Sequence, residues 1–468
     1  MKEKHAAHPY IPNSVSEVKR EMLREIGAKD ADDLYAQMIP ERLRLRRPMD
    51  LPEPILSESD LRRHVAGILA KNRTCKDGPS FLGGGCWQHQ VPVVCDEIAG
   101  RAEFLTAYSG EYYSDLGRFQ SYFEFQSLMA ELVDMDVVSV PTYDWGTAAG
   151  HAVRMAARIT RRKEVVVLGA VSPSRLSILR NFCQLEEMRH HIAMKTVGFD
   201  KRTGMIDTAA VEKRLSEETA AVYFENPSYL GLIEAGGQRI SDVAHELGAQ
   251  VIVGVDPMSL GMIVPPSHYG ADIVCGEIQP LGIHMNCGGG MGGFIASRDE
   301  EQYIAEYPLH LISIAPTGRE GEFGFGYCRF DRSSYIARDK AKDWVGTSSG
   351  LWSIVSAVYL SLMGPEGMKE VGEAIIQKSH YAAEQLSKIK GVKVAYEGFF
   401  KEFVVNFDGT SRSVASINKA LLRKGIHGGL DLSTSFPELG QSALYSVTEM
   451  HTKEDIGRLA DSLREVLE

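Results

Sequence analysis

The 468-residue chain contains no long apolar run and no excess of basic residues. No stretch of about 18 apolar residues is present, so the sequence predicts no membrane-spanning helix. The first ten residues are polar, which argues against a signal peptide. The net charge of −11 argues against a nucleic-acid-binding protein, because contacts to phosphates need a basic surface.

Patterns of cysteine and histidine that bind metals or form disulfides are also missing. The seven cysteines form no CxxC pair, and the fourteen histidines form no HExxH motif. An odd number of cysteines without paired spacing is typical of a reduced, cytoplasmic protein. We therefore expect neither a disulfide framework nor a metal site.

The middle of the chain contains short apolar segments separated by helical patterns. The expected strands are 165–168, 220–224, 250–255, 272–275 and 293–296, and the expected helices include 119–134 and 147–158. Continuous apolar strands of this kind are buried on both faces. The pattern therefore predicts an α/β fold in which helices cover a parallel-rich sheet.

We expect three parts along the chain. Residues 1–72 form an N-terminal helical arm, in which Ser14 and Ser57 precede helices. Residues 73–345 form the large α/β domain, and residues 346–468 form a smaller α+β domain. The small domain is expected to contain a helix over 350–362, strands over 392–396, 402–406 and 443–447, and a last helix that starts after Thr452.

Asp256 directly follows the expected strand 250–255. A large α/β domain followed by a small α+β domain is the layout of fold type I pyridoxal-phosphate enzymes. In these enzymes an aspartate at a strand end pairs with the protonated ring nitrogen of the cofactor. A lysine about 20 to 30 residues later forms the Schiff base. No lysine lies between Lys213 and Lys340, and Gln279 and Pro280 stand at the expected position. We therefore expect no covalently bound cofactor in this chain.

Motifs along nearly the whole chain are more specific than this layout. They are Tyr10–Asn13, Arg46–Pro52, Phe81–Gly85, Glu103–Tyr108, Phe123–Gln126, Gly270–Ile283, Tyr359–Gly367, Lys424–Leu432 and Val447–Asp455. In these motifs the chain resembles the α subunit (subunit 1) of two-subunit glycine decarboxylase, the P-protein of the glycine cleavage system.

The resemblance implies a fold type I, aspartate aminotransferase-like architecture and an enzyme of the aminomethyl-transferring glycine dehydrogenase type. In this family a β subunit carries the Schiff-base lysine and pyridoxal 5′-phosphate, and the α subunit completes the active site at the αβ interface. Glycine is decarboxylated, and its aminomethyl group passes to lipoylated H-protein. The resemblance thus implies an α2β2 assembly and a chain that is inactive alone.

Candidate site residues fall into two groups. The residues expected to line a substrate or interface pocket are His89, Tyr108, Tyr112, Tyr113, Tyr143 and Asp144. Partial or remnant cofactor contacts are expected at Asp256, Gln279 and His284. Other interpretations remain open. Asp144 is also placed to cap a helix, the tyrosines to pack at an interface, and His284 to act as a base in place of the lysine.

Four loops differ from the family pattern. They contain Trp87–His89, Ser109–Asp115, Trp145 and Trp344–Ser348. These differences leave two further hypotheses open: a diverged, partner-dependent enzyme that acts on another amino acid, or a non-catalytic scaffold subunit.

Overall fold

The computed structural model describes residues 10–45, 47, 49–105, 116–183, 191–288, 290–309, 311–328, 332–333, 341–343, 345 and 348–468. The chain divides into two compact units, Met1–Asn72 and Arg73–Glu468. No helix within the described ranges is long and apolar enough to cross a membrane.

The first unit is helical. Its helices are α1 (Ser16–Glu25), α2 (Ala31–Met38) and α3 (Glu58–Leu69), with a 3₁₀ turn η1 (Glu41–Leu43). Ser57 caps α3 as expected, since its side chain accepts a hydrogen bond from the amide of Asp60. The predicted cap at Ser14 is wrong, because α1 begins two residues later and Val15 holds the cap position without a side-chain hydrogen bond.

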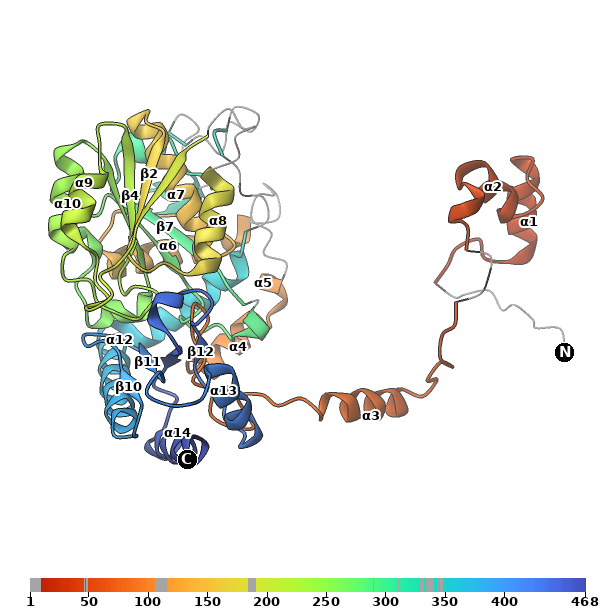
Figure 1. Ribbon diagram of the computed structural model, residues 1–468. Helices are drawn as coiled ribbons and strands as arrows, with labels where there is room; N and C mark the ends of the chain where they lie inside the picture. Colours follow the sequence, from red (N-terminus) through yellow and green to blue (C-terminus); the bar gives the residue numbers. More distant parts are fainter. Residues whose placement is uncertain are drawn as a thin grey trace. The chain divides into compact units, whose positions relative to one another are not determined.

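The second unit is built on a seven-stranded sheet (Figure 1). Its strands are β1 (Val137–Val138), β2 (Glu164–Leu168), β3 (Ala193–Val197), β4 (Thr219–Glu225), β5 (Gln250–Val255), β6 (Ile273–Glu277) and β7 (Gly293–Ser297), in the order β1-β7-β6-β5-β4-β2-β3. Strands β2 to β6 pair in parallel, whereas β7 runs antiparallel to both β6 and β1. All five predicted strands are present.

Helices cover both faces of this sheet. One face packs against α6 (Phe119–Val133), α9 (Thr208–Arg214), α10 (Gly237–Glu246) and the first part of α12 (Gly350–Ser387). The other face packs against α7 (Trp145–Thr160) and α8 (Pro173–Cys183). Figure 1 shows α9 and α10 on one side of β4 and α7 and α8 on the other. We call this sheet with its helices the large domain.

The small domain contains a second, antiparallel sheet. Its strands are β10 (Lys393–Val394), β11 (Glu402–Asn406), β12 (Leu430–Asp431) and β13 (Ser442–Ser446), in the order β10-β11-β13-β12, with helices α13 (Val414–Arg423) and α14 (Lys453–Leu467). Thr452 caps α14 in a capping box. A domain border between residues 345 and 346 stays a prediction.

Helix α12 joins the two domains and differs from expectation. The sequence predicts a helix end near residue 362, but the helix continues to Ser387 through a kink at Gly364, whose φ is 57°. Pro365 then stands in the first turn after the kink, where its missing N–H costs no helical hydrogen bond.

The remaining elements are short. They are helices α4 (Val93–Ala99), α5 (Ala102–Leu105) and α11 (Glu301–Ile304), the hairpin of β8 (Ile312–Pro316) and β9 (Phe323–Tyr327), and the 3₁₀ turns η2 (Leu116–Arg118), η3 (Pro257–Gly261), η4 (Pro266–Tyr269), η5 (Asn286–Gly288) and η7 (Pro437–Leu439).

Candidate functional site

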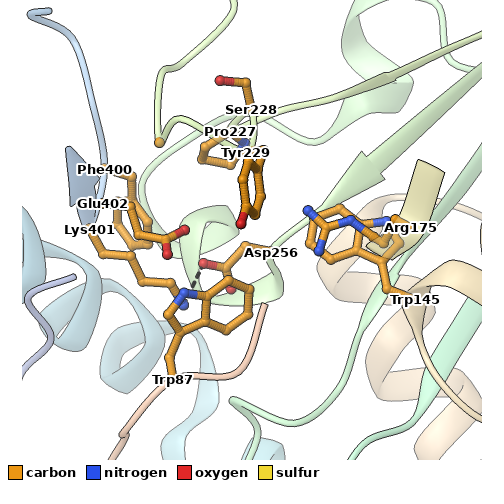
Figure 2. Close-up of a pocket in the computed structure, with 11 residues that line it drawn as sticks. Trp87, Trp145, Arg175, Pro227, Ser228, Tyr229, Asp256, Phe400, Lys401 and Glu402 are labelled. Carbon is orange, nitrogen blue, oxygen red and sulfur yellow. Dashed lines mark ion pairs between the residues drawn. The ribbon is translucent and has the colours of Figure 1, made fainter. Parts of the chain in front are cut away.

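Asp256 lies at the carboxyl end of β5, where ligands of open α/β sheets usually bind. Its side chain is buried, and both carboxylate oxygens have partners. Oδ1 accepts a hydrogen bond from the amide of Met258 at 3.2 Å, and Oδ2 lies 2.7 Å from Nζ of Lys401 (Figure 2). The aspartate that the sequence marks as a cofactor contact is therefore paired within its own chain.

Lys401 comes from the small domain, directly before β11. Its ammonium group lies 3.1 Å from Nε2 of His89 and 3.5 Å from the ring centroid of Trp87, an ammonium-over-indole contact. Nδ1 of His89 in turn lies 2.8 Å from Oε2 of Glu449. Burial alone would raise the pKa of Glu449, but His89 and the amide of Gln90 outweigh burial and lower it to about 2. A buried chain of polar groups thus runs from Asp256 to Glu449.

Arg175 and Glu225 form a second buried pair beside the first. Glu225 ends β4, and its two oxygens accept from Nε and Nη2 of Arg175 at 2.7 and 2.6 Å. The guanidinium group also lies 4.0 Å from the ring centroid of Trp145, the first residue of α7. The edge of the guanidinium group is therefore bonded to Glu225 and its face packs on Trp145.

Gln279 occupies the position at which the sequence argument places a Schiff-base lysine. Its side chain is buried, and it holds the main chain of Trp87 from both sides. Oε1 accepts from the amide of Trp87 at 3.0 Å, and Nε2 donates to the carbonyl of Trp87 at 3.1 Å. Nε2 also donates to the carbonyl of Ile283 at 2.9 Å. Gln279 therefore fixes the segment that carries the Trp87 indole.

Glu277 ties three neighbouring segments together. Its carboxylate accepts from the amides of Gly292 at 2.7 Å, Gln279 at 3.1 Å and Trp145 at 3.2 Å. Burial nevertheless raises the pKa of Glu277 to about 8. The start of α7, the loop after β6 and the glycine-rich turn before β7 thus share one buried carboxyl group.

The glycine run Gly83–Gly85 packs against the small domain. The amide of Gly84 donates to Oε1 of Glu402 at 2.6 Å. Its φ of +87° lies in the left-handed region that favours glycine. Burial raises the pKa of Glu402. This loop therefore serves in domain packing.

The cavity between these groups has a volume of about 20 Å³. It is lined by Trp87, Trp145, Arg175, Pro227, Ser228, Tyr229, Gly231, Asp256, Phe400, Lys401 and Glu402 (Figure 2). A cavity of this size holds about one water molecule. A pyridine ring with a phosphate arm does not fit, because the Trp87 indole and the Lys401 side chain fill the space beside Asp256. The residues present therefore do not match a pyridoxal-phosphate site.

The structure places the remaining candidate residues in different surroundings. Asp144 caps α7 in a capping box with Thr147. Tyr143, directly before it, is 48% exposed. His284 lies at the surface, where Nε2 is 2.9 Å from Oδ1 of Asp96. Tyr108, Tyr112 and Tyr113 lie outside the described residues. Over the described ranges, no group of three or more His, Cys, Asp or Glu residues is arranged to hold a metal ion.

Sequence reasoning missed Lys401 and Arg175 as parts of this pocket. Lys401 precedes a predicted strand, which in sequence is typical of a solvated strand end. The available signal was the lysine itself beside an otherwise apolar strand, Phe403–Val405. Its pairing with Asp256 depends on how the two domains meet.

Comparisons with known proteins agree with one another. Residues 8–463 match the family described as glycine cleavage system P-protein. The chain is 36% identical over 471 residues to a probable glycine dehydrogenase (decarboxylating) subunit 1 of Staphylothermus marinus, covering 98% of each chain. It is similar to a crystal structure of glycine decarboxylase (P-protein) of the glycine cleavage system in inhibitor-bound form, with 33% identity and a TM-score of 0.82 over 98% of this chain and 100% of that chain.

A more distant structure shows the fold alone. A glutamate decarboxylase of Lactobacillus brevis superposes with a TM-score of 0.68 at 13% identity, over 91% of this chain and 95% of that chain. The predicted fold type I class is confirmed by these structural neighbours.

Proposed function

Because the chain belongs to the glycine cleavage system P-protein family, we propose that it is subunit 1, the α subunit, of a glycine decarboxylase. In this role it takes part in the release of carbon dioxide from glycine and the transfer of the aminomethyl group to lipoylated H-protein. The observation that carries the proposed division of labour is the closed pocket at Asp256, which has room for about one water.

We propose that pyridoxal 5′-phosphate resides on a partner β subunit. Two features of this chain support that assignment. Gln279 and Pro280 stand where a Schiff-base lysine is expected, and the Gln279 side chain is hydrogen-bonded to the main chain of Trp87 and Ile283. Lys401 meanwhile pairs with Oδ2 of Asp256. The partner would supply the electron-withdrawing cofactor, and this chain would supply walls of a shared site.

The residues of this chain would position and shield that shared site. We propose that exposed Tyr143 faces the partner, together with Tyr108, Tyr112 and Tyr113. Asp144 supports this surface by capping α7, and His89 supports it by bridging Lys401 and Glu449. Walls of this kind keep water away from the reacting carbon, which protects a carbanion from stray protonation.

We further propose an α2β2 assembly in the cytoplasm. The name subunit 1 among the relatives implies a second subunit. All seven cysteines are free thiols, which agrees with a reducing compartment. H-protein would be a transient partner of the assembled enzyme.

Two of the loop differences concern groups inside the pocket of this chain. The indoles of Trp87 and Trp145 are both buried, and they pack on Lys401 and Arg175. These differences therefore alter the internal packing of this subunit. We infer that they do not by themselves indicate another amino-acid substrate.

A reconstitution tests the proposal. The chain is purified alone, mixed with a glycine decarboxylase β subunit and with lipoylated H-protein, and assayed for exchange of labelled bicarbonate into glycine. Exchange is expected only when all components are present. Turnover of a larger amino acid but not glycine would favour the diverged enzyme, and assembly without any turnover would favour the scaffold subunit.

A further inference from the structure

The pair formed by Asp256 and Lys401 is a deeply buried ion pair that lines the pocket. The two side chains are only 6% and 3% exposed, and the two charged atoms lie 2.7 Å apart. Charged groups are rarely removed from water to this degree unless they are paired. Asp256 belongs to the large domain and Lys401 to the small domain, so the pair spans the seam between them.

The seam around the pair is tight. The amide of Phe400, next to Lys401, donates to the carbonyl of Gly231 in the large domain at 3.1 Å. A Cβ atom at Gly231 would lie 1.9 Å from the carbonyl oxygen of Glu402. On the small-domain side, the amide of Val447 donates to the carbonyl of Lys401 at 2.9 Å. The lysine backbone is thus fixed in one domain while its charge is fixed in the other.

The ammonium group has partners on three sides. Asp256 supplies the negative charge, Nε2 of His89 supplies a lone pair when that ring is neutral, and Trp87 supplies its ring face. An ammonium group has three donors and no acceptor, so this surrounding suits a cation. Met258 donates to the other oxygen of Asp256. The pair is therefore satisfied without a bound ligand.

We propose that Lys401 is an interdomain clamp. Its ammonium group binds Asp256 in the position that the protonated ring nitrogen of the cofactor occupies in fold type I enzymes. In this chain the cation that pairs with the strand-end aspartate is a side chain of the small domain. The clamp holds the small domain on the large domain with the pocket closed. The inference concerns this chain alone and does not rest on the proposed glycine reaction.

Removing one member of such a pair leaves an uncompensated buried charge, whereas removing both leaves none. A double-mutant cycle in the full chain measures this difference through Lys401→Met, Asp256→Asn and the double variant. The surface pair Lys388–Glu384 serves as a matched control, because its charged atoms also lie 2.7 Å apart while both side chains are more than half exposed. Its variants are Lys388→Met, Glu384→Gln and their combination.

We expect Lys401→Met to lower the folding equilibrium constant roughly 10²- to 10³-fold. The double variant should recover most of that loss, and the control cycle should show little coupling. Equal stability of Lys401→Met and the double variant would overturn the proposal. If Lys401→Met does not fold, the double variant decides: a folded double variant supports the clamp, and an unfolded one contradicts it.

Hydrogen exchange tests where the clamp acts. In Lys401→Met, the exchange rates of amides in the seam segments 229–232 and 399–402 should rise by a larger factor than those of amides inside α7, which rise only through the loss of global stability. Uniformly faster exchange throughout the chain would indicate a general loss of stability and would contradict an interdomain clamp.

Chemical rescue tests the requirement for a cation. Lys401→Ala removes Cγ, Cδ, Cε and Nζ of the side chain. The ion n-propylammonium has the same heavy atoms, so it fits the vacated space. We expect n-propylammonium chloride to raise the unfolding midpoint of Lys401→Ala, and not that of Lys401→Ala/Asp256→Asn. Rescue by 1-propanol to the same extent would show that the space matters and the charge does not, which would overturn the proposal.

Discussion

Gln279 and Trp87 are joined by two hydrogen bonds between one side chain and one residue's main chain. Oε1 of Gln279 accepts from the amide of Trp87, and Nε2 donates to its carbonyl, at 3.0 and 3.1 Å. The residue at the position expected for the catalytic lysine therefore positions Trp87, which lines the closed pocket.

Gln279→Met should destabilise the chain. Methionine fills a similar volume but leaves buried main-chain groups of Trp87 without partners, at about 1 to 3 kcal/mol for each unsatisfied group. Chemical denaturation measures the loss in the free energy of unfolding. Gln238→Met is the control, because that exposed side chain bonds only to the exposed Asp242. Equal stability of Gln279→Met and the wild type would contradict the role assigned to Gln279.

Glu277 should make stability fall as pH rises through the neutral range. Its folded-state pKa of about 8 is raised above the ordinary value of 4.5, so the folded state holds the proton more tightly. The contribution of this group to the free energy of unfolding is therefore complete below about pH 4.5 and is lost between pH 4.5 and 8. The size of this contribution is on the order of 5 kcal/mol.

The variant Glu277→Gln cannot ionise and tests this prediction. Denaturation curves are measured for both proteins at several pH values between about 5 and 8. The wild type should lose stability relative to the variant as pH rises, whatever constant offset the amide introduces. A difference between the two proteins that does not change with pH would refute the assignment.

Gly84→Ala should cost more than an ordinary glycine substitution. The left-handed backbone alone costs about 1 to 2 kcal/mol for an alanine. At Gly84 the added Cβ atom would also lie 2.8 Å from Cδ2 of Leu430, and the hydrogen bond to Glu402 would be disturbed. Gly398→Ala is a matched control, since its φ is +74° and no atom lies within 4 Å of the added Cβ. Equal losses of unfolding free energy in the two variants would show that the contact of Gly84 with the small domain does not contribute to stability.

The large sheet was readily predictable from sequence because its strands are apolar on both faces. Strand β5 matches the expected range at both ends, and Asp256 follows it as expected. Strand β3 was not predicted, because it lies at the sheet edge and only Val197 of its residues is buried. The β8–β9 hairpin was also missed, since both strands are partly exposed and β9 contains Gly324 and Gly326.

The pocket was only half predictable. Local sequence predicted the position of Asp256, the absence of the lysine and a possible capping role for Asp144, because each depends on a strand end or a helix start nearby. The partner of Asp256 lies 145 positions later in another domain, and no local pattern connects the two. Sequence therefore indicated that the site had lost its lysine, and the structure shows what fills it.

The central claim is that this chain has no cofactor site of its own and acts with a partner that has one. The most direct measurement is a titration with pyridoxal 5′-phosphate followed by visible absorbance, for the full chain alone and then with a glycine decarboxylase β subunit and glycine. The account predicts no saturable binding to the chain alone and a glycine-responsive band with the partner. A borohydride-reducible adduct on the chain alone would show that a lysine reaches an open pocket, and would contradict the account.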